Sequence, residues 1–211
     1  MIQKELFASV ETNNSKTIIV GLDEAGRGPL AGPVYAAAVI LPDSFPFEFL
    51  NDSKKLSAKK RKEAEIIIKK EAVAYAIGFA TASEIDELNI LWASMLAMKR
   101  AYIKVSEIYS GQINLALIDG NRVPDIPIKS EAIVKGDAKI HEIMAASILA
   151  KNARDEIMLL CDKKWPIYGF KKHMGYPTKI HRQMLEKYGA CPIHRKSFSF
   201  KKVESKQIEL F

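Results

Sequence analysis

Two apolar runs without helical periodicity flank a short polar segment near the start of the chain. The first ends in the β-branched residues of positions 17–20, and the second covers positions 34–41. Runs of this length and composition are typical of strands that are covered on both faces of a sheet. The pattern therefore predicts strands at about residues 16–23 and 33–41. The sequence GRGPLAG between them predicts a turn that reverses the chain.

The rest of the chain alternates between helix-like and strand-like segments. Helices are predicted after Ser57 and over residues 83–106 and 138–160, and strands over residues 72–80, 113–118 and 132–134. Ser57 is expected to be the N-cap of the first helix, and Ser83 with Asp86 resembles a capping box at the start of the second. This alternation after an initial hairpin predicts an α/β fold with a mixed five-stranded sheet flanked by helices.

Positive charge is concentrated in the last quarter of the chain. The formal net charge is +7, and residues 161–211 carry twelve Lys and Arg against four Asp and Glu. This distribution is typical of nucleic-acid binding, because phosphate neutralisation supplies most of the non-specific affinity, although a solvated surface would look the same. We expect one continuous domain, with a catalytic core over residues 1–160 and a basic helical extension and tail over residues 161–211.

Composition also bears on the compartment. No segment approaches the roughly 20 apolar residues that a membrane helix needs, and the N-terminus does not read as a secretion signal. The two cysteines, Cys161 and Cys191, lie far apart without a CxxC spacing, which argues against a disulfide framework or a zinc site. We therefore expect a cytoplasmic protein.

Acidic residues follow three of the predicted strands. Asp23 and Glu24 end the first strand, Asp119 ends the fourth, and Asp137 follows the fifth. Because the carboxyl ends of neighbouring strands converge in open α/β sheets, these carboxylates would repel one another unless cations lay between them. Oxygen ligands without nearby histidine or cysteine favour Mg²⁺ or Mn²⁺, and two such ions can activate water against a phosphodiester. Taken singly, Asp137 would be a helix N-cap and Asp119 a turn residue.

A series of motifs along nearly the whole chain resembles bacterial ribonuclease HII. The motifs are GLDEAGRGPLAGPV (21–34), DSKKLS (52–57), IDG (118–120), KGDAK (135–139), AASILAKNARD (145–155), GYPTKIH (175–181) and HRKSF (194–198). The resemblance implies a ribonuclease H-like fold with a helical C-terminal extension. It also implies cleavage of RNA in RNA/DNA hybrids and at single ribonucleotides in duplex DNA. With in-line attack by metal-bound water, we expect a cut on the 5′ side of the ribonucleotide that leaves 3′-OH and 5′-phosphate ends.

The resemblance assigns roles residue by residue. The family's four catalytic, metal-binding acids, which hold two Mg²⁺ or Mn²⁺ ions, correspond to Asp23, Glu24, Asp119 and Asp137. Its recognition loop corresponds to Gly26, Arg27 and Gly28, and its junction-sensing tyrosine corresponds to Tyr176. The candidate phosphate contacts are Lys54, Lys55 and Lys179. Glycines without a Cβ let the loop backbone approach a 2′-OH, and Tyr176 would stack on the sugar 3′ of the ribonucleotide. Without the resemblance, Tyr176 would be a turn aromatic and the lysines ordinary surface residues.

Two features lie outside this set. His141 follows Asp137 by one turn and could carry a proton, but we interpret it as a surface residue. The chain ends in QIELF (207–211), which resembles the pentapeptide by which bacterial replication and repair proteins bind the sliding clamp, with Gln207, Leu210 and Phe211 as contacts. The alternative is an unstructured tail that ends in apolar residues.

Two competing functions are compatible with parts of the sequence. The chain could be a nuclease of the same fold that acts on DNA junctions, and the glycine loop with Tyr176 argues against this. It could also be a non-catalytic module that binds RNA/DNA hybrids, and the complete set of four acids argues against that.

Overall fold

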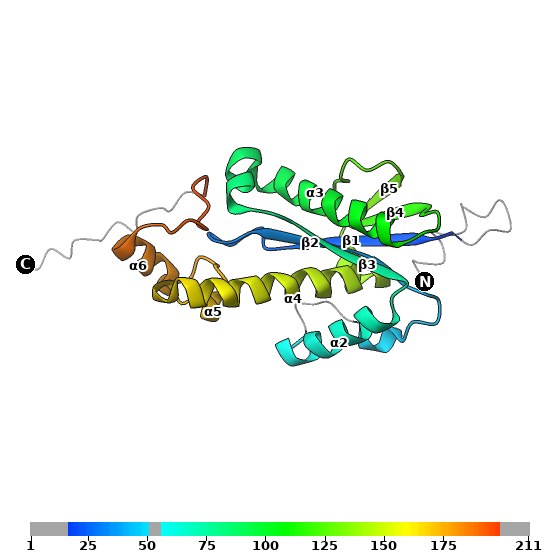
Figure 1. Ribbon diagram of the computed structural model, residues 1–211, viewed down its shortest axis with the longest axis horizontal. Helices are drawn as coiled ribbons and strands as arrows, with labels where there is room; N and C mark the ends of the chain where they lie inside the picture. The colour runs from blue at the N-terminus through cyan, green and yellow to red at the C-terminus, as the bar shows by residue number, and fades with distance from the viewer. Residues whose placement is uncertain (1–16, 51–55, 199–211) are drawn as a thin grey trace, which may run out of the picture.

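The computed structural model describes residues 17–50 and 56–198, which form a five-stranded sheet with helices on both faces (Figure 1). The strands are β1 (Ile19–Ala25), β2 (Val34–Ile40), β3 (Ala74–Ala80), β4 (Leu115–Asp119) and β5 (Lys129–Ile133), in the order β3-β2-β1-β4-β5. Strand β2 pairs antiparallel with β1 and β3, whereas β4 pairs parallel with β1 and β5. The mixed five-stranded sheet is therefore confirmed.

The parallel pairing brings the ends of β1 and β4 together. Leu22 pairs with Ile118, so that Asp23 and Asp119 are the next residues on two neighbouring strands. Asp119 in turn pairs with Ile133, the last residue of β5. Three parallel strands thus end at one edge of the sheet, where a ligand crevice is expected in this class of fold.

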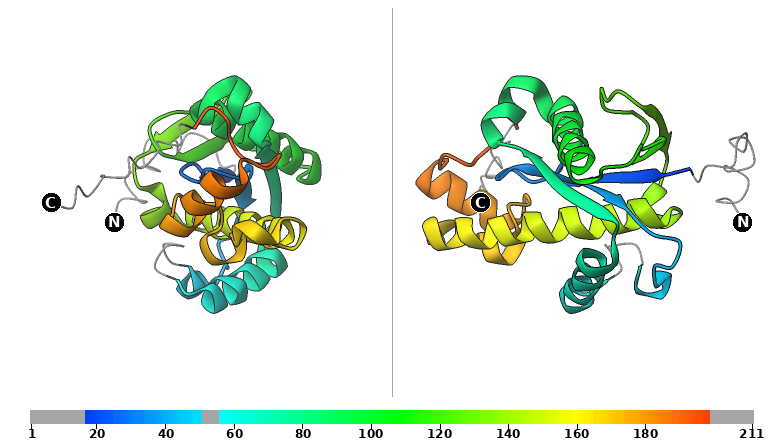
Figure 2. Two further views of the ribbon diagram at one scale, coloured as in Figure 1. Left: turned by 90° about the vertical axis from the view of Figure 1, so that its left-hand side faces the viewer. Right: turned by 45° about the vertical axis from the view of Figure 1, so that its right-hand side comes forward.

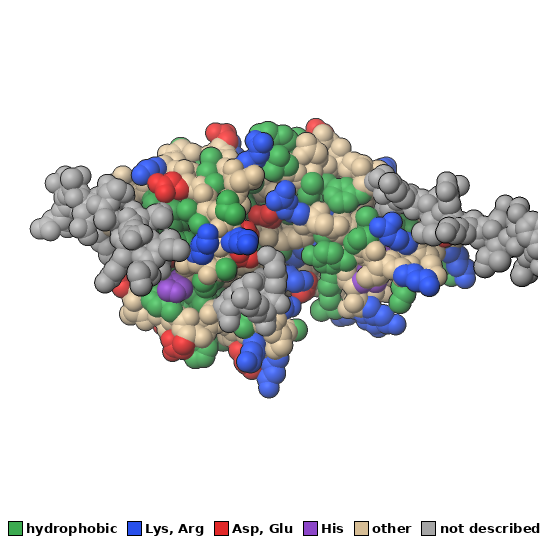
Figure 3. Space-filling model, turned by 180° about the vertical axis from the view of Figure 1, so that it is seen from behind, with side chains coloured by type: hydrophobic (Ala, Val, Ile, Leu, Met, Phe, Trp, Pro, Cys, Tyr) green, Lys and Arg blue, Asp and Glu red, His purple; other side chains and the backbone are tan. Residues whose placement is uncertain are grey.

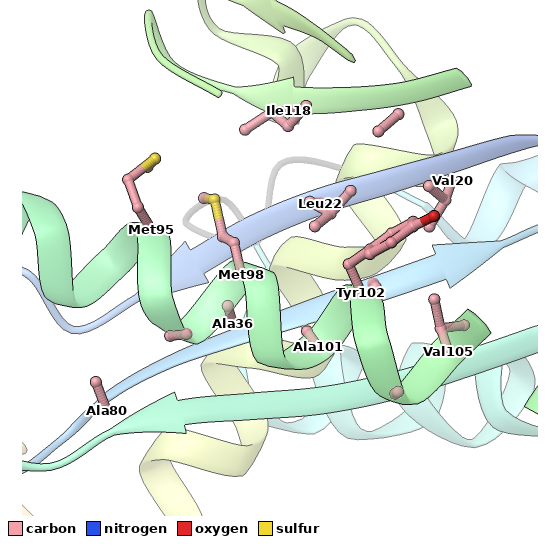
Figure 4. Close-up of a cluster of buried hydrophobic side chains, with 14 of the residues drawn as sticks. Val20, Leu22, Ala36, Ala80, Met95, Met98, Ala101, Tyr102, Val105 and Ile118 are labelled. Carbon is pink, nitrogen blue, oxygen red and sulfur yellow. The ribbon is translucent and has the colours of Figure 1, made fainter. Parts of the chain in front are cut away.

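Helices cover the sheet on both faces, which explains why its central strands are apolar on both sides. Helix α3 (Ala82–Ile108) covers one face, and α4 (His141–Lys164) with α2 (Ala58–Glu71) covers the other (Figures 1 and 2). On the α3 face, Met98 lies next to Leu22 and Tyr102 lies beside Val20 (Figure 4). The continuous apolar runs of β1 and β2 are the signature of strands buried on both faces.

The helix starts agree only in part with the prediction. Ser57 caps α2 by accepting a hydrogen bond from the Lys60 amide, as predicted. The predicted capping box of α3 is wrong, because the box is formed two residues earlier by Thr81 and Glu84. Asp86 instead accepts hydrogen bonds from the Lys196 and Ser197 amides and the Ser197 hydroxyl, which ties the C-terminal segment to α3.

Helix α4 runs without a break into the C-terminal extension, which adds η3 (Pro166–Tyr168), α5 (Phe170–His173) and α6 (Lys179–Tyr188). Met158 and Cys161 of α4 pack there with Tyr168 and Phe170. The extension lies at the end of the molecule where α4 ends, as Figures 1 and 2 show. Within residues 17–50 and 56–198, no helix is long and apolar enough to span a membrane.

Candidate active site

Three of the four predicted acids meet at the edge of the sheet. Asp23 lies near the end of β1, Asp119 ends β4, and Asp137 lies in the short helix η2 (Gly136–Ala138). One carboxylate oxygen from each lies within 4.8 Å of the others. Asp119 also accepts hydrogen bonds from the Gly136 and Asp137 amides, at 2.7 and 3.3 Å. This contact fixes η2, and with it Asp137, against the end of β4.

Asp137 is not the N-cap of the helix that follows it. Helix α4 begins at His141 rather than at the predicted residue 138, and Ile140 is its N-cap, with no side-chain cap bond. The intervening turn starts at Lys135, whose backbone is left-handed with φ of 58°. The side chain of Asp137 is therefore not needed to start α4, which removes the structural interpretation of this acid.

The acids of the site are buried, so their negative charges are unfavourable unless positive charge lies nearby. Asp23 is only 4% exposed and Asp137 only 6%. Burial, followed by the charges of Glu24 and Asp119, raises the pKa of Asp23 well above its ordinary value. Burial also raises the pKa of Glu24. Divalent cations would relieve this cost, and an all-oxygen donor set suits Mg²⁺ or Mn²⁺, so that the residues fit such ions.

Glu24 faces two partners and stands apart from the cluster of three. Its Oε1 atom lies 3.3 Å from Nη1 of Arg27, and its side chain is 10% exposed. The charge of Asp119 raises the pKa of Glu24, whereas the charge of Arg27 lowers it. Glu24 is thus placed between the carboxylates and the loop that follows β1.

The glycine loop (26–28) begins directly after β1 and lies beside Tyr176. Gly26 has φ of +102°, and a Cβ atom there would lie 2.1 Å from Nε of Arg154. A Cβ atom at Gly28 would lie 3.6 Å from the ring of Tyr176. Tyr176 is 41% exposed and the Arg27 side chain is 51% exposed, so both can reach a ligand. The structure therefore joins the two elements that the sequence places 150 residues apart.

Two buried arginines hold this loop in place, and their role could not be predicted from the sequence. Arg195 donates hydrogen bonds to the carbonyls of Gly26, Arg27 and Gly32, at 2.6 to 2.9 Å. Arg154 donates to the carbonyls of Ala31, Pro33 and Met174. Both side chains are fully buried, and neither forms an ion pair with any residue that the structure describes.

Burial of these guanidinium groups lowers their pKa values, because a buried charge is poorly solvated. Burial and the charge of Arg154 lower the pKa of Arg195 to about 9. Hydrogen bonds to backbone carbonyls offset part of this cost and fix the carbonyl directions of the loop. The only sequence signal for these arginines is their place inside the motifs AASILAKNARD and HRKSF.

Replacing Gly26 by Ala is expected to lower the free energy of unfolding by more than the cost of a positive φ alone. Positive φ costs roughly 1–3 kcal/mol in a non-glycine residue, and overpacking against Arg154 adds about 1–3 kcal/mol. Gly120→Ala is the matched control, because Gly120 has φ of +108° and open space around its Cβ position. Urea unfolding of both variants measures the difference, and equal losses would contradict the role of the clash.

The remaining predicted residues lie outside the carboxylate cluster or outside the described ranges. Lys179 is exposed at the start of α6. His141 is half-buried and stacks on Phe47 with ring centroids 4.2 Å apart, so it is less solvated than a surface residue. Lys54, Lys55, Gln207, Leu210 and Phe211 lie outside the described residues. Figure 3 shows Asp and Glu side chains in a hollow near the middle of one face, with Lys and Arg beside them.

Comparisons with known proteins identify the family of this chain. The family model of ribonuclease HII matches residues 20–201. Ribonuclease HII of Dechloromonas aromatica is 55% identical over 181 residues, which cover 86% of this chain and 90% of the relative. Ribonuclease HII of Vibrio parahaemolyticus is 54% identical over 181 residues, covering 86% of this chain and 84% of the relative.

Solved structures show the same fold at low sequence identity. Ribonuclease H2 from Pyrococcus horikoshii OT3 has a TM-score of 0.69 at 23% identity, covering 87% of this chain and 95% of that one. The PCNA:RNase HII complex from Archaeoglobus fulgidus matches with a TM-score of 0.69 at 24% identity, covering 90% and 98%. The chain therefore has a ribonuclease H-like fold, belongs to the ribonuclease HII family and is a metal-dependent endonuclease of the ribonuclease H class.

Proposed function

We propose that this ribonuclease cuts the RNA strand of RNA/DNA hybrids and cuts on the 5′ side of single ribonucleotides in duplex DNA, leaving 3′-OH and 5′-phosphate ends. One observation carries the proposal. Strand β1 delivers Asp23 to the carboxylate cluster, and the glycine loop that lies beside Tyr176 starts at the next residue after the strand. The glycine loop, which would recognise the ribose, is thus held at a fixed distance from the carboxylate cluster, where the phosphodiester would be cut.

In this proposal Asp23, Asp119 and Asp137 hold two Mg²⁺ or Mn²⁺ ions, and Glu24 completes the set. When bound, divalent ions activate water for attack on the phosphodiester and stabilise the leaving oxygen. The protein's part is to keep the carboxylates in place. The Ser147 hydroxyl and the Glu24 amide donate hydrogen bonds to Asp23, and the η2 amides donate to Asp119.

Substrate selection is assigned to the loop and to Tyr176. Backbone groups of Gly26 and Gly28 would bond to the 2′-OH in the minor groove, where no Cβ stands in the way. The exposed Tyr176 ring would stack on the deoxyribose 3′ of the ribonucleotide, and Arg27 would contact a phosphate. Lys54, Lys55 and Lys179 are further candidates for phosphate contact. In this proposal the core (1–160) and the basic extension (161–211) form one continuous domain, and the extension grips the duplex.

Mapping of cleavage sites tests this proposal. A DNA duplex with one ribonucleotide is expected to be cut once, directly 5′ of that residue, only when Mg²⁺ or Mn²⁺ is added, whereas an all-DNA duplex and a DNA junction stay intact. Cleavage of the junction, or cuts unrelated to the ribonucleotide, would favour the DNA-junction nuclease instead. Turnover itself separates both from a non-catalytic hybrid-binding module, which the 54–55% identity to named ribonucleases already disfavours.

We also propose that the C-terminal QIELF binds the bacterial sliding clamp through Gln207, Leu210 and Phe211. The Archaeoglobus fulgidus neighbour was solved as a complex with PCNA, which supports the general mode of partnership. Deletion of residues 207–211 is expected to lower clamp affinity at least ~10-fold, measured by surface plasmon resonance, with cleavage of a short hybrid unchanged. Unchanged clamp affinity would refute the proposal.

A further inference from the structure

Three of the four histidines in the chain lie buried together behind Tyr176. They are His173 of α5, His181 of α6 and His194 in the segment that follows α6, and none is more than 8% exposed. The His173 and His181 rings stack with centroids 4.5 Å apart. Nε2 of His181 lies 3.0 Å from Nε2 of His194. This histidine cluster has no part in the proposed chemistry, so its role needs a separate explanation.

The hydrogen bonds fix where the protons lie. Nδ1 of His181 is 2.9 Å from the Tyr176 carbonyl, which can only accept, so His181 carries its proton on Nδ1. Nδ1 of His194 lies 2.9 Å from the Cys191 amide and 3.3 Å from the Cys191 carbonyl. The shorter contact to the amide, together with the need for one donor between the two rings, assigns the proton of His194 to Nε2. The bond between the two rings then runs from Nε2–H of His194 to the bare Nε2 of His181. All three donors along this chain are matched by acceptors.

His173 supports the same segment from the other side. Its Nε2 donates to the Tyr168 carbonyl at 2.9 Å, and its Nδ1 accepts from the Gly175 amide at 3.2 Å. The backbone carbonyl of His173 accepts from the Tyr176 amide at 2.8 Å. The amide and the carbonyl of Tyr176 are therefore both bonded to histidines. Leu30, which lies just after the glycine loop, joins the same segment through its amide, which donates to the Gly175 carbonyl.

We propose that His181 is a positioning residue. Through the Nδ1–H bond to the Tyr176 carbonyl it sets the backbone position and the ring orientation of Tyr176, and thereby the selectivity for single ribonucleotides. The inference rests on the proposed role of Tyr176 at the ribonucleotide junction. His181 is fully buried and acts through Tyr176 rather than by contact with the substrate. A side chain that is 41% exposed, as Tyr176 is, can stack on a sugar only if its backbone is held.

The surroundings keep this arrangement in the neutral state. The groups packed against His181 are the His173 ring, the His194 ring and the Phe170 ring. Burial, together with the neighbouring histidines, lowers the pKa of His181 to about 4. Burial lowers the pKa of His194 as well. A second proton on His181 would point Nε2–H at Nε2–H of His194, which is a contact between two donors.

A matched pair of substitutions tests the proposal. In His181→Asn the side-chain amide occupies the place of Nδ1 and keeps the bond to Tyr176. In His181→Gln the amide reaches the place of Nε2, beside His194, and that bond is lost. The readout is the ratio of kcat/KM for a single-ribonucleotide duplex to kcat/KM for an RNA/DNA hybrid. We expect the ratio to fall about 10-fold in His181→Gln, as for loss of one hydrogen bond, and to stay within ~3-fold of wild type in His181→Asn.

The outcomes separate this inference from the proposed function. An equal ratio in both variants, whether reduced or not, would overturn it, because a merely structural role does not distinguish Nδ1 from Nε2. If Tyr176→Ala itself leaves the ratio unchanged, the junction role of Tyr176 fails. If Tyr176→Ala lowers the ratio and His181→Gln does not, only the positioning role fails.

A measurement on the wild-type protein does not depend on how the variants fold. Long-range ¹H–¹⁵N spectra at neutral pH are expected to show three neutral rings, with the proton on Nδ1 in His181 and on Nε2 in His173 and His194. A charged ring or a proton on Nε2 of His181 would overturn the proposal.

Discussion

Asp23→Asn is expected to abolish cleavage while making the metal-free protein more stable. The loss in kcat should be roughly 10³-fold or more, as for other essential catalytic groups, because Asp23 lies within 4.8 Å of Asp119 and Asp137. Hybrid binding should survive, since the loop and Tyr176 are unchanged. Single-turnover cleavage with Mg²⁺ and fluorescence anisotropy with EDTA measure the two effects. Metal-dependent turnover in the variant would contradict the assignment of Asp23.

The gain in stability follows from the raised pKa of Asp23. A carboxyl whose pKa is higher in the folded than in the unfolded protein binds protons more tightly when folded. Its contribution therefore favours folding at low pH and is lost as pH rises from the ordinary value of 3.8 towards the folded-state value. In EDTA, the thermal midpoint of Asp23→Asn should exceed that of wild type at neutral pH, and the difference should vanish in acid.

A surface acid serves as the control for this variant. Asp125 pairs with Lys99 at 2.6 Å, and its side chain is 95% exposed. Asp125→Asn is therefore expected to leave both kcat and the thermal midpoint near their wild-type values, because exposed ion pairs contribute at most about 1 kcal/mol. A midpoint for Asp23→Asn at or below that of Asp125→Asn at neutral pH would argue against electrostatic strain at the carboxylate cluster.

Tyr176→Ala is expected to lower cleavage at a single ribonucleotide by about 10- to 100-fold, in line with the ~1–3 kcal/mol that aromatic stacking supplies in nucleic-acid binding. Cleavage within a long hybrid should fall much less, because neighbouring ribonucleotides offer the glycine loop further 2′-OH contacts. Tyr176→Phe keeps the ring and should retain most of the selectivity. The measurement is kcat/KM on both substrates, and an equal loss on both would contradict the junction role.

The sheet and the convergence of its acids could be predicted from the sequence because both depend on regular patterns. Apolar runs mark buried strands, and the residues that follow parallel strands meet at one edge, which placed Asp23 and Asp119 together. The edge strand β5 begins at Lys129, three residues before the predicted start at residue 132. Its first three residues are polar or charged, so they do not form part of an apolar run. An edge strand need not be apolar along its whole length.

Other parts of the site have no periodic signature. Asp137 reads locally as an N-cap, and only the three-dimensional contact of η2 with Asp119 reveals its position. The bonds from Arg195 to the loop carbonyls, and from His181 to Tyr176, join side chains to backbone groups. Such bonds follow no spacing rule, so that the residue types alone do not predict them.

The anchoring of the glycine loop by Arg195 has a consequence for synthesis of the protein. Gly26 and Arg195 are 169 residues apart, so the loop emerges from the ribosome long before its anchor does. Strand β1 can pair with its neighbours earlier, which would assemble the carboxylates first, whereas contacts between distant residues form late. Ribose discrimination would thus be acquired after the cutting centre is in place.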